Sequence, residues 1–344
     1  MAQRRSPATL EDVARAAGVS ISTASRTLNG RPTKVSQSTQ ARVRAAAETL
    51  GYATNLAAQA MASGRSSTIG LLTGQVPDDY QNPVVAGVFR SAASRDRLVA
   101  TAVFDHAEIE RTRAIVRQLR GLRAPTVFLV GTSDPEAPGM PELLGELQLV
   151  EEDGGRVVLI GQTHPTFDSV VVDDVRAGAD MASALVELGY RRFAVLAGAG
   201  SGLLAPRRLE GFATALADLG VELPPDAVIW NDFDHDGGYR GAGELLRRRP
   251  GVEAVVCSND AMAIGASVRF REAGLVVGRD IALAGCDDIP ALRDVDPPLT
   301  SMHLPWDEAA DAAFALAEHE RSDGRSVVLA GYPVIRLSTP GLAG

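Results

Sequence analysis

Residues 9–30 read TLEDVARAAGVSISTASRTLNG, and this stretch predicts two short helices joined by a tight turn. Thr9 can cap the first helix, with Asp12 three positions later in a capping-box arrangement. Gly18 stands where a left-handed residue ends a helix, and Ser20 can cap a second helix over Ile21–Leu28. The pattern therefore predicts a helix-turn-helix, although an ordinary helical hairpin would share it.

A third helix is expected over Thr39–Leu50, capped by Ser38 or Thr39 and stopped by Gly51. The apolar positions of the three helices recur at helical spacing and should form one small core. These positions are Leu10, Val13, Ala14, Ala17, Val19, Ala24, Leu28, Val43, Ala46, Ala47 and Leu50. A domain of about 50 residues is only marginally stable by itself.

The outward positions of the second helix carry no acid. A helix that enters the major groove must keep carboxylates away from phosphates and offer donors and apolar contacts to base edges. Arg26 can bind guanine through two hydrogen bonds, and Ile21 can contact a thymine methyl. The remaining outward residues are short or polar: Ser22, Thr23, Ser25 and Asn29. This surface predicts a DNA-reading helix.

The charge is divided unevenly along the chain of 344 residues, whose net charge is −9. Residues 1–65 carry nine Lys and Arg against three Asp and Glu, whereas the remainder carries 25 against 40. A basic head on an acidic body predicts that the head binds a polyanion. Counted by charge alone, a solvated basic tail is an equal alternative.

Composition narrows the class of protein. No run approaches the roughly 18–20 apolar residues of a membrane helix, and no apolar segment follows Arg4 and Arg5 as in a secretion signal. Cys257 and Cys286 cannot form a disulfide framework, which fits a reducing compartment. They are expected as buried small hydrophobes, with a redox pair as the alternative. A cytoplasmic protein associated with the nucleoid is expected.

Residues 9–30, followed by VSQSTQARVRAAAETLGYATNLAAQAMASGRSSTIGLL at 35–72, resemble the N-terminal domain and linker of the LacI/GalR family of bacterial transcriptional repressors. The resemblance implies that Ile21, Ser22 and Arg26 read bases. Gln40 departs from the usual Arg of the family. Further DNA contacts are implied for Thr9, Leu10, Ser20, Thr23, Ser25, Asn29, Ser36, Thr39, Tyr52, Asn55 and Ala58.

The segment from Asn55 to Gly64 is short and rich in alanine. About ten residues are too few for a stable isolated helix, but alanine lets a partner induce one. In the family this hinge becomes helical on operator DNA and pairs with its mate in the dimer. Met61 stands where the family has an apolar residue, typically Leu, that inserts into the minor groove and kinks the duplex. A flexible spacer is the alternative.

From Thr68 onward, short β-branched runs alternate with helical stretches, which predicts parallel sheets with helices on both faces. Strands are expected at 68–72, 98–104, 126–130, 156–160, 169–172, 192–197, 254–257 and 281–286, and helices at 108–120, 177–188, 206–219 and 259–273. Because around 270 residues exceed one sheet, two lobes with a cleft are expected. The expected domains are a head at 1–54, a hinge at 55–65 and a body at 66–344. The first lobe would span about 66–172 and 304–331, and the second about 173–303 and 332–340.

Polar side chains gather after several of these strands, where ligands of parallel sheets bind. Arg208, Asn259 and Asp287 offer donors and acceptors, while Phe233 and Trp306 offer aromatic faces. Such a set suits the hydroxyls and C–H faces of a sugar. Asn259 as a simple helix cap, and Asp287 with Asp288 as a simple loop, are the alternatives.

The segments APRRLEGF (205–212), CSNDAMAIGA (257–266), LAGCDDIP (283–290) and PPLTSMHLPW (297–306) resemble the effector-binding core of the LacI/GalR family, which is similar in fold to periplasmic sugar-binding proteins. The resemblance therefore implies an all-α helix-turn-helix domain followed by an α/β, two-lobed periplasmic-binding-protein-like domain of type I. It implies effector contacts by Tyr80, Asn82, Arg208, Phe233, Asn259, Asp287 and Trp306. Gly161 and Leu304 depart from polar residues that the family often has in the cleft.

Taken together, these patterns predict a homodimeric repressor that binds pseudo-palindromic operator DNA under control of a small effector, expected to be a sugar or sugar derivative. A solute-binding protein and a Rossmann-like oxidoreductase are the alternatives, the latter because Gly198–Gly202 follows a strand. The five histidines are scattered without metal-ligand spacing. No metal, cofactor, membrane contact or enzymatic activity is expected.

Overall fold

The computed structural model describes residues 8–28, 35–53, 66–74, 83–103, 108–131, 138–199, 203–248, 251–319 and 324–342. The chain divides into two units, Met1–Ser67 and Thr68–Gly344, called here the head and the body. Six residues with predicted roles lie outside the described residues: Asn29, Asn55, Ala58, Met61, Tyr80 and Asn82.

The head contains α1 (Leu10–Ala17), α2 (Ile21–Leu28) and α3 (Gln37–Thr49). The capping box predicted for α1 is confirmed, since the hydroxyl of Thr9 accepts from the backbone N–H of Asp12 and the Asp12 carboxylate accepts from that of Thr9. Gly18 ends α1 with φ of 64°. Ser20 caps α2, because its Oγ accepts from Thr23 N at 3.2 Å.

The core of the head is formed by Val13, Ala14, Ala17, Ala24, Val43 and Ala47. Two details of the prediction for α3 are wrong. The helix begins at Gln37, because Ser36 rather than Ser38 or Thr39 is the N-cap. Leu50 is 40% exposed, because α3 ends before it and the chain turns there, so that Tyr52 packs against the core instead.

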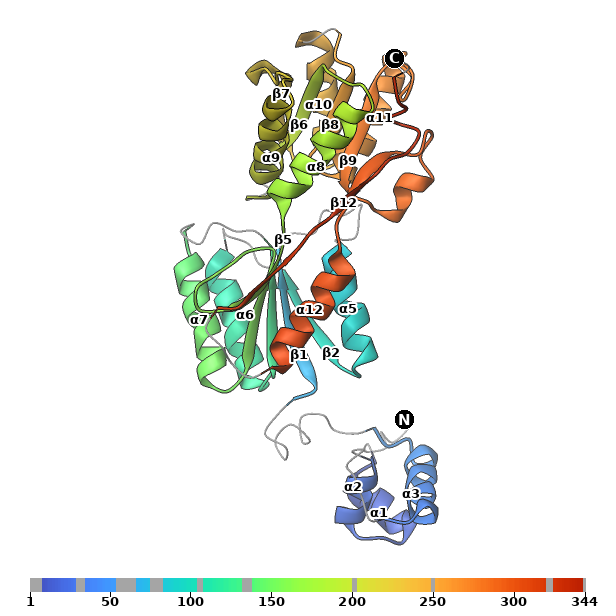
Figure 1. Ribbon diagram of the computed structural model, residues 1–344. Coiled ribbons are helices and arrows are strands. Elements are labelled where there is room, and N and C mark those ends of the chain that lie inside the picture. Colours follow the sequence, from blue (N-terminus) through green and yellow to red (C-terminus); the bar gives the residue numbers. More distant parts are fainter. Residues whose placement is uncertain are drawn as a thin grey trace, which may run out of the picture. The chain divides into compact units, whose positions relative to one another are not determined.

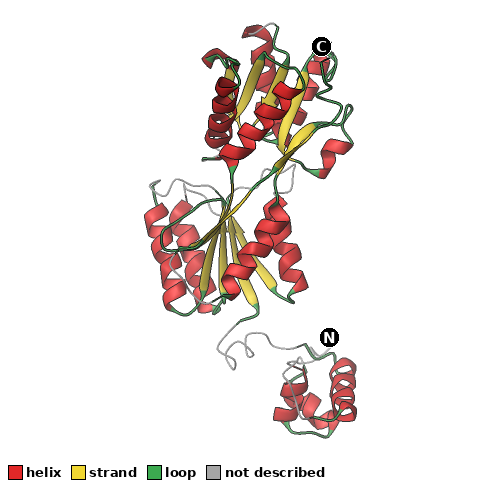
Figure 2. Ribbon diagram, in the orientation of Figure 1, coloured by secondary structure: helices red, strands yellow, loops and turns green. Residues whose placement is uncertain are grey.

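The first sheet of the body is parallel throughout, in the order β11-β5-β4-β3-β1-β2. Its strands are β1 (Thr68–Thr73), β2 (Leu98–Val103), β3 (Thr126–Val130), β4 (Arg156–Ile160), β5 (Asp168–Val172) and β11 (Ser326–Leu329). One face is covered by α5 (Pro83–Ser94) and α12 (Trp306–Glu318), and the other by α6 (Ile109–Gly121) and α7 (Met140–Glu152). Figure 2 shows these two helical layers around the sheet.

The second sheet has the order β12-β10-β9-β8-β6-β7 and is parallel except for β12. Its strands are β6 (Phe193–Ala199), β7 (Val228–Asp232), β8 (Ala254–Cys257), β9 (Ala282–Asp287), β10 (Thr300–His303) and β12 (Tyr332–Val334). The helices α8 (Asp174–Glu187) and α9 (Leu204–Asp218) cover one face, and α10 (His235–Arg248) and α11 (Asp260–Glu272) the other. Two lobes with largely parallel sheets are therefore confirmed.

The chain passes between the two sheets at three places, from β5 to α8, from β10 to α12 and from β11 to β12 (Figure 1). Strands β7, β10, β11 and β12 were not predicted. Most predicted elements differ from the observed ones by a few residues, and α8 begins a turn earlier because Asp173 caps it. No helix among the described residues is long and apolar enough to cross a membrane.

Candidate DNA-binding and effector-binding sites

The predicted base-reading residues lie on one exposed face of α2. Ile21 is 50% exposed, and Ser22 and Arg26 are exposed beside it. Arg26 Nε donates to the carbonyl of Ser22 at 3.1 Å, and Arg26 Nη2 donates to Ser22 Oγ at 3.4 Å. The guanidinium is therefore held along the helix surface, while Ala24 and Thr27 face the core.

Three of the predicted phosphate contacts are also helix caps: Thr9, Ser20 and Ser36. A helix N-terminus favours an anion, because its first N–H groups point outward and the helix dipole is positive there. Leu10 and Tyr52 instead pack against the head core. Ser25 and Thr39 are half-buried. Contacts of all these residues with DNA stay a prediction.

In the body, a cavity of about 590 Å³ is lined by residues of both lobes. Asp287 and Trp306, both predicted effector contacts, line it. Leu304, one of the noted departures from the family, also lines it and is buried. The remaining lining residues are Pro83, Ala86, Arg90, Asp288, Ile289, Pro290, Ala291, His303, Asp307 and Glu308.

Arg208 lies behind this cavity in α9 and is only 6% exposed. Its Nε donates to Asp174 Oδ1 at 2.8 Å, and its Nη1 donates to the carbonyl oxygen of Ser258 at 2.6 Å. Its Nη2 lies 3.6 Å from Asp287 Oδ1. The guanidinium of Arg208 is thus oriented by the Asp174 carboxylate and the Ser258 carbonyl. Its Nη2 lies beside Asp287, which lines the cavity.

Asp287 ends β9 and Asp288 follows it, with unusual φ angles of 117° and 55° respectively. The turn is held by Asp260, whose Oδ2 accepts from the N–H of Ile289 at 2.8 Å and whose Oδ1 accepts from the hydroxyl of Ser301 at 2.6 Å. Backbone strain of this kind persists where surrounding contacts enforce it, often at ligand sites. Asp287 therefore faces the cavity because a buried hydrogen-bond network holds it there.

Two carboxyl groups of this cluster have raised pKa values. Burial raises the pKa of Asp287 to about 6, with the positive charge of Arg208 opposing the shift. Burial also raises the pKa of Asp260 to about 8, and the negative charge of Asp287 adds to the shift. Titratable groups with shifted pKa values around a cavity are typical of binding sites.

The Asp260→Asn variant tests this cluster through the pH dependence of stability. Because the folded state binds a proton on Asp260 more tightly than the unfolded chain, the free energy of unfolding should fall as pH rises from about 4 to about 8. Asparagine should remove this part of the slope, measured by urea unfolding at several pH values. The exposed control Asp236→Asn should keep it. If the free energy of unfolding depended on pH equally in wild type and Asp260→Asn, the raised pKa of Asp260 would be contradicted.

Asn259 and Phe233 lie together but do not line the cavity of about 590 Å³. Asn259 Oδ1 accepts from Met262 N at 2.8 Å and so caps α11, and its Nδ2 donates to the carbonyl oxygen of Phe233 at 3.2 Å. The alternative of a helix cap is therefore correct for Asn259, and a further role toward an effector stays a prediction, as it does for Phe233.

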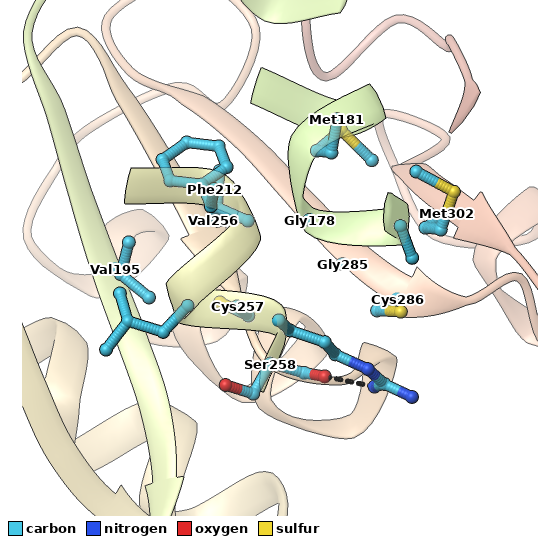
Figure 3. Close-up of a pocket in the computed structure, with 13 residues that line it drawn as sticks. Gly178, Met181, Val195, Phe212, Val256, Cys257, Ser258, Gly285, Cys286 and Met302 are labelled. Atoms are coloured by element: carbon cyan, nitrogen blue, oxygen red, sulfur yellow. Dashed lines mark hydrogen bonds between the residues drawn. The ribbon is translucent and has the colours of Figure 1, made fainter. Parts of the chain in front are cut away.

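Figure 3 shows a second, small cavity of about 30 Å³ in the core of the second lobe. Met181, Phe212, Cys286 and Met302 line it, and the hydrogen bond at Ser258 lies at one end. Both cysteines are free and buried. Burial raises the pKa of each thiol. They pack into cores on opposite faces of the second sheet, which favours the expectation of small buried hydrophobes over a redox pair.

Four residues of the site were not predicted: Asp174, Ser258, His303 and Arg336. Asp174 follows β5, so the strand-end rule that identified Asp287 could have found it. His303 Nδ1 lies 3.2 Å from Asp288 Oδ2, and Arg336 Nη2 donates to Asp288 Oδ1 at 2.5 Å. These two come from the short β10 and from the segment after β12, which no strong sequence pattern marks.

Comparison with known proteins identifies the same two parts. The family described as bacterial regulatory proteins, lacI family, matches residues 9–55, and a periplasmic binding protein-like domain matches residues 182–339. The HTH-type transcriptional regulator GalR of Escherichia coli K12 is 33% identical over 319 residues, which cover 91% of this chain and 90% of that protein. The chain belongs to the LacI family. As a member of this family it is a DNA-binding transcriptional regulator, and the predicted resemblance and fold class are confirmed.

Other LacI-family proteins agree with this assignment. The regulator CelR of Thermobifida fusca is 31% identical and covers 89% of this chain and 89% of that protein. Among solved structures, a lac repressor dimer bound to operator and the anti-inducer ONPF has a TM-score of 0.80 at 26% identity, covering 97% of this chain and 100% of that one. A complex of CelR with cellobiose has a TM-score of 0.67 at 28% identity, covering 96% and 99%.

Proposed function

We propose that this LacI-family chain is a homodimeric repressor whose affinity for operator DNA is controlled by a sugar or sugar derivative. The observation that carries the proposal is the pairing of an acid-free exposed α2 surface in the head with a cavity of about 590 Å³ in the body. The solved relatives bound to operator and to cellobiose support each half.

In this proposal α2 enters the major groove, with Ile21, Ser22 and Arg26 against base edges. The capped N-termini of the three helices lie near the phosphate backbone, where a helix N-terminus stabilises an anion. Two heads of a dimer would read the two half-sites of a pseudo-palindrome. The hinge at 55–65, with Met61 as the minor-groove residue, lies outside the described residues and stays part of the proposal.

The effector would bind in the cavity between the lobes. In this proposal the Asp287 carboxylate accepts hydrogen bonds from effector hydroxyls, and Arg208 Nη2, which lies beside Asp287, donates one. The Trp306 ring offers an apolar face to the sugar C–H groups. Since the chain crosses between the sheets beside this cavity, ligand binding can bias the arrangement of the lobes. A coupling of about 1–3 kcal/mol between effector and operator is typical of such regulators, and it acts equally in both directions.

The Arg26→Ala variant tests the DNA half of the proposal. Duplexes selected from a random library by the full chain serve as operators. Loss of a two-hydrogen-bond contact to guanine should weaken specific binding by about 1–3 kcal/mol and relax preference at one base pair. Fluorescence anisotropy at fixed salt measures both effects.

The control for that experiment is Arg15→Ala, which removes the same charge from α1, where Arg15 pairs with Glu11 and Asp12. It should leave base preference unchanged. If Arg26→Ala weakens random and selected duplexes equally, Arg26 does not read bases.

The alternative functions fit the structure less well. A Rossmann-like oxidoreductase would need Gly198 to admit a phosphate, but a Cβ there would lie 2.0 Å from the Phe233 ring, so that glycine serves close packing. A solute-binding protein would not need the helix-turn-helix head. No cluster of metal ligands occurs in the described part of the chain. We propose a non-enzymatic regulator that acts on chromosomal DNA in the cytoplasm.

A further inference from the structure

The guanidinium groups at the effector cavity already have carboxylate partners. Arg208 donates to Asp174 and lies next to Asp287. Its Nη1 is also bound to the Ser258 carbonyl, so Nη2 is the nitrogen that lies beside Asp287, which lines the cavity. An anionic ligand would have to compete with two carboxylates for this one cation.

The second guanidinium of the cluster is Arg336, which donates to Asp288. The other oxygen of Asp288 faces His303 Nδ1. On the other side of the cavity, Arg90 pairs with Asp307. Among the described residues around the cavity, each of these guanidinium groups is therefore neutralised by the protein itself.

Carboxylates outnumber guanidinium groups in the connected cluster behind the cavity. Asp174, Asp287 and Asp288 stand against Arg208 and Arg336, while the Asp260 carboxyl beside them, with a pKa of about 8, adds no cation. Asp260 is 1% exposed and has hydroxyl and backbone N–H partners rather than a cation among its hydrogen bonds. The wall that ends at Asp287 therefore has an excess of negative charge, which opposes a ligand phosphate or carboxylate at short range.

The polar groups of the cavity wall that are open to a ligand are suited to hydroxyl groups. Asp287 presents acceptor oxygens at the cavity. The indole N–H of Trp306 is buried beside Asp287 and favours its ionised form, while the Trp306 side chain lines the cavity. A hydroxyl can donate a hydrogen bond to the Asp287 carboxylate, whereas a dianionic phosphate has no proton to donate and is repelled by it.

Resting on the proposed function, we infer that the effector of this cavity carries no phosphate or carboxylate group: it is an unphosphorylated, hydroxyl-rich molecule. Sugar phosphates and sugar acids are rejected by the wall formed by Asp287, Asp288 and their partners. Binding of the phosphorylated form should be at least about 100-fold weaker than binding of the parent sugar.

The test is a thermal-shift and calorimetric comparison of the full chain with matched pairs: glucose, galactose and ribose, each against its terminal phosphate, with glucuronate as a sugar acid. Binding of a parent sugar without binding of its phosphate supports the inference. Tighter binding of any phosphate or of glucuronate overturns it and leaves the proposed function standing. If no compound binds, the sugar class in the proposed function fails, and the inference fails with it.

A second arm uses inorganic phosphate as the probe and does not depend on the choice of sugar. The body of wild type should show no stabilisation by phosphate beyond that of equal ionic strength of chloride. Asp174→Asn removes one negative charge but keeps an acceptor for Arg208, and it should raise phosphate affinity about 10-fold. The control Asp180→Asn changes an exposed carboxylate of the same helix α8 and should have no effect. Stabilisation of the wild-type body by phosphate, or equal behaviour of the two variants, overturns the inference.

Discussion

Replacing Arg208 by alanine is expected to lower the free energy of unfolding of the body by about 3–5 kcal/mol and to abolish the response of DNA binding to effector. The side chain is buried, and its removal leaves the Asp174 carboxylate, itself 4% exposed, without its cation. The carbonyl of Ser258 loses its donor as well. Urea unfolding measures the stability, and operator titration with and without effector measures the response.

Stability and ligand contact can be separated with a paired variant. Asp174→Asn combined with Arg208→Gln removes both charges of the closest pair, so the Asp174 position no longer holds a buried carboxylate without its cation, and part of the stability should return. The effector response should stay absent, because no guanidinium lies beside Asp287 any longer. Full stability of the single Arg208→Ala variant would contradict the buried ion pair. A normal effector response in either variant would remove Arg208 from the site.

Gly178→Ala should also lower the free energy of unfolding and weaken the effector response, but through a steric clash and not through the loss of a charge pair. Helix α8 crosses α9 so closely that a Cβ at Gly178 would lie 2.0 Å from the backbone oxygen of Arg208. Backbone cannot rotate away as a side chain can, so the helices must separate. We expect a loss of about 3 kcal/mol in the free energy of unfolding and weaker effector binding, because α9 carries Arg208.

The matched control is Gly145→Ala in α7, where an added Cβ has no neighbour within 4 Å. There alanine should stabilise the chain by about 0.5–1 kcal/mol, since it is a better helix former. Thermal or urea unfolding of both variants gives the comparison. A neutral Gly178→Ala would mean that α8 and α9 can separate without cost.

Local patterns explain why the three helices of the head could be predicted, with errors only at the ends of α3. Caps, a left-handed glycine and helical spacing all act within a few residues, so Thr9, Gly18 and Ser20 could be assigned directly. The errors arose where neighbouring candidates compete. Ser36, Ser38 and Thr39 are all good caps, and only the structure shows that Ser36 is used.

The body was predicted in outline, but its site only in part. Arg208 and Asp287 follow strong strands and were found, and the structure brings them together. His303 and Arg336 come from short edge elements whose pairing depends on residues far away in the chain. The charge balance around Asp288 is likewise a product of long-range contacts, which no local pattern contains.

The left-handed backbone conformation of Asp287 determines what a selection for stability alone would favour at this position. Only glycine adopts φ of 117° readily, so aspartate there costs the fold on the order of 1–3 kcal/mol. A laboratory screen that rewards heat resistance alone would therefore favour glycine at this position. Variants selected in this way would be more heat-resistant proteins whose promoter occupancy no longer follows the level of the metabolite.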